Sequence, residues 1–121
     1  MSRRYRYITV AAILASCIGL PRALAEEWSL IHNGFLTGNQ FLNAGDSTKR
    51  GYLMGFIDGL LVSPFVGAPK EKIVWLERCL DGMNDRQIVA IFDTWLTKNP
   101  AHWHEPAHAL AFRAFREACQ N

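Results

Sequence analysis

The stretch from Asn84 to Pro100, NDRQIVAIFDTWLTKNP, carries the strongest structural signal in the chain. Asn84 and Gln87 have the spacing of a capping box, in which each side chain accepts a hydrogen bond from the other residue's backbone N–H. Apolar residues then recur on one helical face; they are Ile88, Ile91, Phe92, Trp95 and Leu96. Asn99 precedes a proline, and such residues avoid helical backbone conformations. The stretch therefore predicts an amphipathic helix that ends at Asn99-Pro100.

A second helix is predicted at the carboxyl end of the chain. One helical face there consists mainly of alanines; its members are Ala107, Leu110, Ala111, Ala114, Phe115 and Ala118. Because alanine side chains are short, this face can lie close to a neighbouring helix. The segment therefore predicts a tightly packed last helix that leads up to Cys119.

Two further helix starts lie upstream. Thr37 and Gln40 again have the spacing of a capping box and predict a short helix through Leu42. Asp46 or Ser47 can then cap a longer helix. The apolar face of that helix has the i, i+3, i+4, i+7 spacing and consists of Leu53, Phe56, Ile57 and Leu60.

A row of glycines repeats every four residues within the longer helix: Gly51, Gly55 and Gly59. Glycine lowers helix propensity but leaves one side bare, so that another backbone can approach closely. We interpret the row as a packing groove for a second helix. If it faces solvent instead, it becomes a candidate surface for a partner. Charged residues such as Asp58 argue against a membrane dimerisation motif of the same spacing.

The region between the long helix and the helix that begins near Asn84 gives a weaker signal. Pro64 to Pro69 is predicted to be a loop. For residues 71–80 two structures stay open. The spacing of Ile73, Leu76 and Leu80 suits a helix, whereas the β-branched and aromatic run that begins at Ile73 suits an extended strand.

Residues 1–25 have the features of a secretory signal peptide. Three arginines among the first six residues precede an apolar stretch from Ile8 to Leu20. Ala23-Leu24-Ala25 then places small residues at the positions that a signal peptidase recognises. We therefore expect cleavage after Ala25, which leaves residues 26–121 as a single periplasmic domain.

Two other fates of the leader stay open. Leu14-Ala15-Ser16-Cys17 resembles a bacterial lipobox, so a lipidated Cys17 would attach the protein to a membrane. A retained transmembrane helix is disfavoured because a span needs about 20 apolar residues and this run is shorter.

Cleavage after Ala25 leaves two cysteines, Cys79 and Cys119. Disulfides persist outside the cytoplasm, so we predict that these two residues are bonded; two buried free thiols are the alternative. The bridge would close a loop of about 40 residues, which the chain-entropy relation values at roughly 4 kcal/mol. The predicted fold is mostly α: a small single-domain bundle of about four helices with one disulfide.

The charge distribution argues against nucleic-acid binding. The 121-residue chain has 13 basic and 11 acidic residues, but four of the basic ones lie in the leader, so residues 26–121 have a net charge of −2. The nine remaining Lys and Arg residues are scattered among the acidic ones. A nucleic-acid footprint requires clustered positive charge.

One string matches the H-E-x-x-H pattern of zinc peptidases: His104-Glu105-Pro106-Ala107-His108. In those enzymes both histidines project from one face of a helix. Pro106 suits a helix only near its first turn, which leaves His104 at the cap. We therefore interpret these histidines as exposed or capping residues. The alternative is a metal binder or metal-dependent hydrolase that uses His102, His104 and His108.

Other catalytic signatures are missing from the sequence, including a Gly-rich phosphate loop, a serine nucleophile elbow and a Cys–His pair at a helix start. Asp58 and Asp93 fall off the main apolar stripes, and we interpret them as solvated or helix-to-helix hydrogen-bonding residues. The sequence therefore predicts a protein that is not an enzyme and needs no cofactor.

Several short motifs carry a family resemblance. They are Thr37-Gly38-Asn39-Gln40-Phe41-Leu42, Gly51-Tyr52-Leu53-Met54-Gly55-Phe56-Ile57-Asp58, and then in order Cys79, Gln87-Ile88, Leu96, Pro100, His104, Ala107 and Cys119. In these positions the chain resembles the Rap/Tai-type immunity family, small periplasmic proteins that neutralise peptidoglycan-attacking effectors of type VI secretion. The chain departs from that family at Asn43-Ala44-Gly45 and Arg50, where members often carry a further cysteine pair. It also has Leu80-Asp81 where a proline is usual.

The resemblance and the lack of a catalytic constellation together predict a binding protein. Trp28, Trp75, Trp103 and Phe65 lie outside the two strongest apolar stripes, and large aromatic residues of this kind anchor interfaces. We take Trp75 and Trp103 as candidate interface residues, either for a secreted peptidoglycan hydrolase or for a second copy in a homodimer. They cover the core in the alternative interpretation. A periplasmic structural or chaperone-like module is the third possibility for function.

Overall fold

The computed structural model describes residue 31 and residues 33–120. The expected signal peptide, its cleavage after Ala25, the lipobox at Cys17 and the aromatic Trp28 lie outside these residues. The expectations about them therefore remain predictions.

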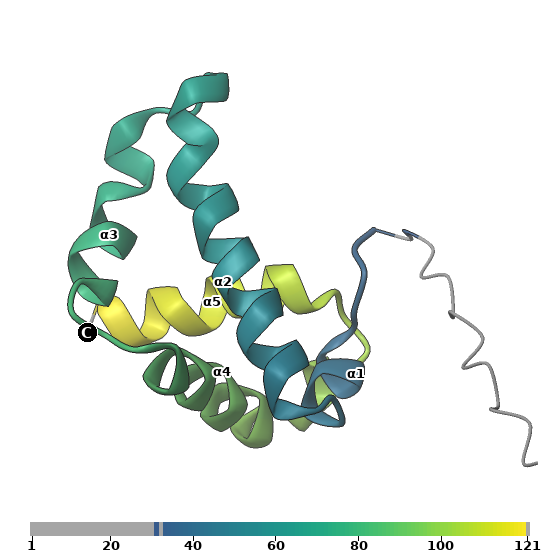
Figure 1. Cartoon of the computed structure of the whole chain (residues 1–121). Coiled ribbons are helices and arrows are strands. Elements are labelled where there is room, and N and C mark those ends of the chain that lie inside the picture. Colours follow the sequence, from purple (N-terminus) through teal and green to yellow (C-terminus); the bar gives the residue numbers. More distant parts are fainter. Residues whose placement is uncertain (1–30, 32, 121) are drawn as a thin grey trace, which may run out of the picture.

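The described residues form a helical fold with one disulfide, as predicted (Figure 1). Its elements in chain order are α1 (Gly38–Leu42), α2 (Asp46–Val62), η1 (Ser63–Val66), η2 (Lys70–Lys72), α3 (Val74–Leu80), α4 (Asp85–Lys98), η3 (Pro100–His102) and α5 (Ala107–Cys119). The η elements are single 3₁₀ turns. Within this part of the chain no helix is both long and apolar enough to cross a bilayer.

Both predicted capping boxes are confirmed. The Thr37 hydroxyl accepts from the backbone N–H of Gln40 at 3.2 Å, and the Thr37 N–H donates to the Gln40 side chain at 2.9 Å. At α4 the Asn84 side chain accepts from the Gln87 N–H at 3.0 Å, with the return bond at 2.9 Å. These local bonds satisfy N–H groups that the first helical turn leaves without partners, so sequence spacing alone locates the two starts.

The start of α2 differs from the prediction. Gly45, and neither Asp46 nor Ser47, is the N-cap residue, and no side chain caps this end. Asp46 lies in the first turn, where a carboxylate interacts favourably with the helix dipole, and it pairs with Arg50 one turn later at 3.5 Å. A first-turn acid can therefore be mistaken for a cap.

The open question about residues 71–80 is resolved as a helix. After the η2 turn, α3 runs from Val74 to Leu80, and the helically spaced Ile73 and Leu76 are both buried. The only bridge outside helices in the described residues joins Thr37 to Pro106, so no strand lies beside α3 to pair with an extended segment. Its packing partner is instead α5.

The core lies where α1, α4 and α5 meet the inner faces of α2 and α3. Its largest fully buried side chains come from all five α-helices, and they are Phe41, Leu53, Leu76, Phe92, Leu96, Leu110 and Phe115. Phe41 and Phe92 are in ring contact, with centroids 4.7 Å apart. Two ion pairs fasten α2 to α4 beside the core, Lys49–Asp93 at 3.0 Å and Arg50–Asp85 at 3.3 Å.

The second half of α2, η1, η2 and α3 form a projection that we call the arm. Figure 1 shows α2 and α3 rising away from α4 and α5, with the connection between them at the far end. The predicted loop at Pro64 to Pro69 is thus partly regular, because its first residues continue α2 as the η1 turn. The arm holds its free end clear of the core.

Candidate protein-binding surface

The free end of the arm exposes apolar side chains. Phe65 is 88% exposed and Val66 83%, and Leu61 and Val62 are exposed beside them. We call these four residues the tip. They make up four of the seven large exposed apolar residues in the described part of the chain. Contiguous exposed apolar surface of this kind marks interaction sites, whereas single exposed apolar residues are ordinary.

Local sequence fixes the backbone that carries the tip. Pro64 occupies the first turn of η1, where its restricted φ favours the turn. The Ser63 hydroxyl donates to the carbonyl of Leu60 at 2.6 Å at the end of α2. Gly67 then adopts a φ of 100°, which side-chain-bearing residues rarely take, and its N–H donates to the carbonyl of Pro64. Phe65 and Val66 therefore project from a hydrogen-bonded turn.

The glycine row faces outward, which corrects the predicted packing groove. A Cβ placed on Gly51, Gly55 or Gly59 would meet no atom within 4 Å. The row lies on the side of α2 opposite the buried Leu53 and Ile57. The outer face of α2 is therefore open and leads to the tip, and the alternative of a partner surface is the one that the geometry favours.

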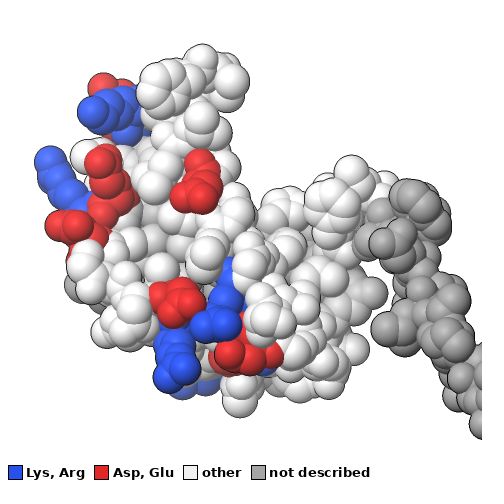
Figure 2. Space-filling model, in the orientation of Figure 1, with Lys and Arg blue, Asp and Glu red and all other residues white. Residues whose placement is uncertain are grey.

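Charge is unevenly distributed around the tip. Figure 2 shows the end of the arm as an uncharged surface, with charged side chains gathered over the side formed by η2 and α3. Lys70, Glu71 and Lys72 of η2 are all exposed. An apolar centre with charges at its edge is the arrangement found in protein interfaces.

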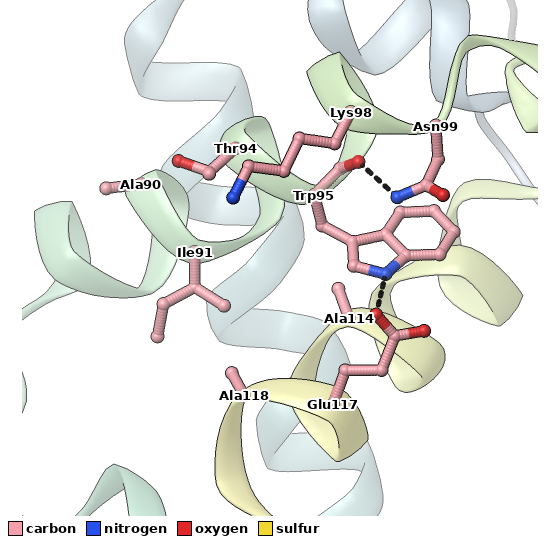
Figure 3. Close-up of a pocket in the computed structure, with 9 residues that line it drawn as sticks. All are labelled: Ala90, Ile91, Thr94, Trp95, Lys98, Asn99, Ala114, Glu117 and Ala118. Atoms are coloured by element: carbon pink, nitrogen blue, oxygen red, sulfur yellow. Dashed lines mark hydrogen bonds between the residues drawn. The ribbon is translucent and has the colours of Figure 1, made fainter. Parts of the chain in front are cut away.

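A groove of about 490 Å³ runs between α4 and α5 on another part of the surface (Figure 3). The short side chains of Ala90, Ala114 and Ala118 leave this space open. Ala118, predicted to join the buried stripe of α5, is instead exposed because it lies at the helix end beside the groove. The Trp95 indole N–H donates to Glu117 at 2.7 Å, so these two groups of the groove are bonded to each other.

The two predicted interface tryptophans are half-buried against the core. The Trp75 indole N–H donates to the Lys72 carbonyl at 2.7 Å, and its ring meets Phe112 edge-on. The Trp103 indole N–H donates to the Leu96 carbonyl, also at 2.7 Å. Their role in a partner interface stays a prediction. Phe65, which the sequence also singled out, is the most exposed large apolar residue of the described chain.

The predicted disulfide joins Cys79 on α3 to Cys119 at the end of α5, with the two Cα atoms 5.6 Å apart. It therefore ties the base of the arm to the helix that forms one wall of the core. This covalent bond fastens the arm to the core, and the ion pairs of Lys49 and Arg50 fasten to α4 the first half of α2, from which the arm continues.

The H-E-x-x-H string is not helical throughout. Helix α5 begins only at Ala107, so His104 precedes it, in agreement with the predicted effect of Pro106. His102 instead hydrogen-bonds to Glu105, whose carboxylate also pairs with Arg113 at 2.9 Å. Among the described residues no group of three or more His, Cys, Asp or Glu side chains is placed to hold a metal ion.

The acidic residues of the helices have the predicted structural roles. Asp93 makes a helix-to-helix ion pair with Lys49, and Asp58 is exposed on the outer face of α2.

Two other side chains have shifted pKa values. The hydrogen bond from His102, reinforced by the nearby Arg113 charge, lowers the pKa of Glu105. Partial burial raises the pKa of the Tyr52 phenol, and a hydrogen bond with the His108 backbone opposes that rise.

Within the part of the chain that the structure describes, the geometry therefore offers surfaces suited to binding another protein, and comparison with known proteins agrees with that description. A family model described as Rap1a immunity proteins matches residues 9–119, almost the whole chain. Neither a curated protein nor a solved structure matches it. Because the match extends over well more than half of the sequence, the chain belongs to the Rap1a immunity protein family.

Proposed function

We propose that this protein is a periplasmic immunity protein of type VI secretion that binds and occludes a peptidoglycan-attacking effector, without chemistry of its own. The family supports an immunity role with a protein effector as partner. The observation that carries the binding mode is the exposed tip. Phe65 and Val66 project at the end of the arm, where they can enter a concave surface on another protein.

The tip has the composition expected of a binding hot spot. Interface energy concentrates in a few residues, and aromatic side chains are frequent among them. Phe65 can bury most of its ring on association because it is 88% exposed in the free protein. Its backbone turn is already formed, so little conformational entropy is lost when it binds.

Co-purification with secreted hydrolases encoded near the gene tests this role. The double variant Phe65→Ser, Val66→Ser should bind about tenfold more weakly or worse, since hot-spot residues contribute more than 1.4 kcal/mol. Phe35→Ser is the matched control, because Phe35 is also exposed but lies next to α1, away from the arm. Equal binding by wild type and the tip variant would reject the tip as the binding site.

The tryptophan prediction is tested in the same assay. Trp75→Ala and Trp103→Ala remove rings that also cover the core, so circular dichroism must first show that both variants are folded. If folded Trp75→Ala binds the hydrolase as wild type does, this residue is a core residue and no part of the interface.

A homodimer would be the competing use of the tip. Sedimentation equilibrium of wild type and Phe65→Ser distinguishes the two uses. A wild-type monomer supports effector binding through the tip, whereas a dimer that Phe65→Ser dissociates would assign the tip to self-association.

Export is tested by the mass of the protein recovered from cells. A chain that begins at Glu26 supports a soluble periplasmic protein, in keeping with the Ala23-Leu24-Ala25 site. A diacylated species that begins at Cys17 would place the protein on a membrane instead.

Deletion of the gene tests the immunity role itself. A deletion that leaves cells no more sensitive to attacking neighbours would reject that role altogether.

A further inference from the structure

A second concave feature lies at the base of the arm, where α2, α3 and α4 meet. It is a hollow of about 270 Å³. Its apolar wall consists of Ile57 and Leu61 of α2, Leu76 and Leu80 of α3, and Ile88 of α4. Pockets for drug-sized ligands occupy roughly 300–1,000 Å³, so this hollow is better matched to one side chain of a partner than to a separate small molecule.

The rim of the hollow is acidic. Glu77 of α3 and the C-cap residue Asp81 both line it, four residues apart, and both are exposed. Among the described residues no basic side chain lines the hollow: Arg78 lies between the two acids in sequence, and Arg86 lies at the start of α4, but neither belongs to the lining. Within the described chain no ion pair includes Glu77 or Asp81, whereas Asp46, Asp85, Asp93 and Glu105 are all paired.

One of these two carboxylates, that of Asp81, is poorly placed for the stability of the fold, whereas Glu77 lies in the first turn of α3, where a carboxylate is favourable. Asp81 is the C-cap residue of α3, and the carboxyl end of a helix favours cations. Like charges four residues apart also repel each other. A positive charge brought by a partner would relieve both effects.

The combination of an apolar wall and an acidic rim specifies a particular kind of side chain. Lysine and arginine have apolar stems that lie along apolar surface while the charged end stays at the rim. A purely apolar side chain would cover the carboxylates without pairing them, which is costly. An acidic side chain would be repelled.

We infer that this hollow receives a lysine or arginine side chain of the effector, with the stem against Leu61 and Leu80 and the cationic end paired with Glu77 and Asp81. The inference rests on the proposed function, which it extends by naming what the partner presents. Leu61 belongs both to the tip and to the hollow, so one continuous surface holds both contacts.

Small probes test the hollow without the effector. The protein, labelled at Ile, Leu and Val methyl groups, is titrated with n-pentylammonium, and with n-pentanol and pentanoate as neutral and anionic analogues of similar length. Pentylammonium should shift the methyl signals of Ile57, Leu61, Leu76, Leu80 and Ile88 and bind about fivefold more tightly than pentanol, as expected for exposed ion pairs. Equal binding of both, or shifts centred elsewhere, would overturn the inference.

Matched charge variants identify the carboxylates. Glu77→Gln and Asp81→Asn should each weaken pentylammonium binding about two- to fivefold and reduce its sensitivity to salt. Glu71→Gln removes an equivalent exposed carboxylate that does not line the hollow, so it should bind the probe as wild type does. A loss that is the same in Glu71→Gln and Glu77→Gln would show only a general effect of net charge and would reject the site.

The two proposals fail in distinguishable ways. If the probe does not bind while the double variant Phe65→Ser, Val66→Ser still weakens hydrolase binding, the hollow is rejected and the proposed function stands. If the probe binds at the hollow but the tip variant leaves hydrolase binding unchanged, the proposed binding mode fails. Where both hold, Glu77→Gln with Asp81→Asn should weaken hydrolase binding at low salt and have a smaller effect at high salt, because salt screens exposed charges.

Discussion

Two rows of small residues in this molecule have opposite environments. The alanines of α5, Ala107, Ala111 and Ala114, are at most 1% exposed and lie against the other helices. The glycines of α2, Gly51, Gly55 and Gly59, have open space on their side. From sequence both rows were predicted to be packing surfaces, and only the alanine row is one.

The difference lies in where the large apolar residues of each helix stand. On α5 the alanines share a face with Leu110 and Phe115, which are fully buried. On α2 the glycines stand opposite Leu53 and Ile57, which point into the core. A row of small residues permits close approach on that side, but the large apolar face decides which side of the helix is covered.

The largest expected effect comes from removing the disulfide that joins α3 to α5, the helix with the buried alanines. Replacing both Cys79 and Cys119 by alanine should lower the free energy of unfolding by about 4 kcal/mol, because the reduced chain gains the entropy of a 40-residue loop. Denaturant unfolding monitored by fluorescence measures the loss. Thiol labelling of the unreduced, unfolded wild type should find neither cysteine free, and two labelled cysteines would contradict the disulfide.

Leucine insertion compares the two rows directly. Ala111→Leu places a larger side chain in a filled core and should cost about 1–3 kcal/mol. Gly55→Leu enters open space and gains helix propensity, so the melting temperature should not fall. A large destabilisation by Gly55→Leu would show that the outer face of α2 is covered in solution.

Glycine-to-alanine substitutions at a covered and an open position test the same difference in environment with a single added methyl group. A Cβ on Gly38 would lie 2.8 Å from a Leu110 methyl and 3.2 Å from the Trp103 Cα, so Gly38→Ala should destabilise the protein by about 1–3 kcal/mol. Gly55→Ala should stabilise it by about 0.5–1 kcal/mol, since no contact opposes the gain in helix propensity. Thermal unfolding of the two variants measures both signs, and equal signs would refute the assignment of the two environments.

Features fixed by neighbouring residues could be predicted from the sequence. The boxes at Thr37 and Asn84 depend on hydrogen bonds between residues three apart, so spacing is sufficient to find them. The disulfide followed from cysteine count once the leader was set aside. The helical face of α4 followed from its regular apolar period.

Features that depend on distant parts of the chain could not be predicted in this way. The tip is exposed because the arm projects beyond α4 and α5. The residues from Leu61 to Val66 do not by themselves indicate whether another helix covers them. Phe65 could be recognised as lying outside the main stripes, but its exposure could not. The hollow is likewise assembled from three helices, so its lining at Ile57, Glu77 and Ile88 has no signature in sequence.

The smallest expected effect concerns the start of α5, the helix with the buried alanines. There Glu105 links His102 to Arg113 just ahead of Ala107. The pKa of Glu105 is lower in the folded protein than its ordinary value of 4.5, so the charged form is the one that the fold stabilises. This stabilisation is fully present when the pH lies above 4.5, the ordinary pKa, and it is lost as the pH falls through the lower pKa of the folded protein.

Glu105→Gln should therefore melt at a lower temperature than wild type at neutral pH, and the difference should shrink as the solution is acidified below 4.5. Asp58→Asn on the outer face of α2 is the control for the loss of an exposed carboxylate, because no ion pair in the described residues includes Asp58. A Glu105→Gln difference that grows on acidification would show that the Glu105 carboxylate opposes folding at the end of the helix that carries the buried alanines.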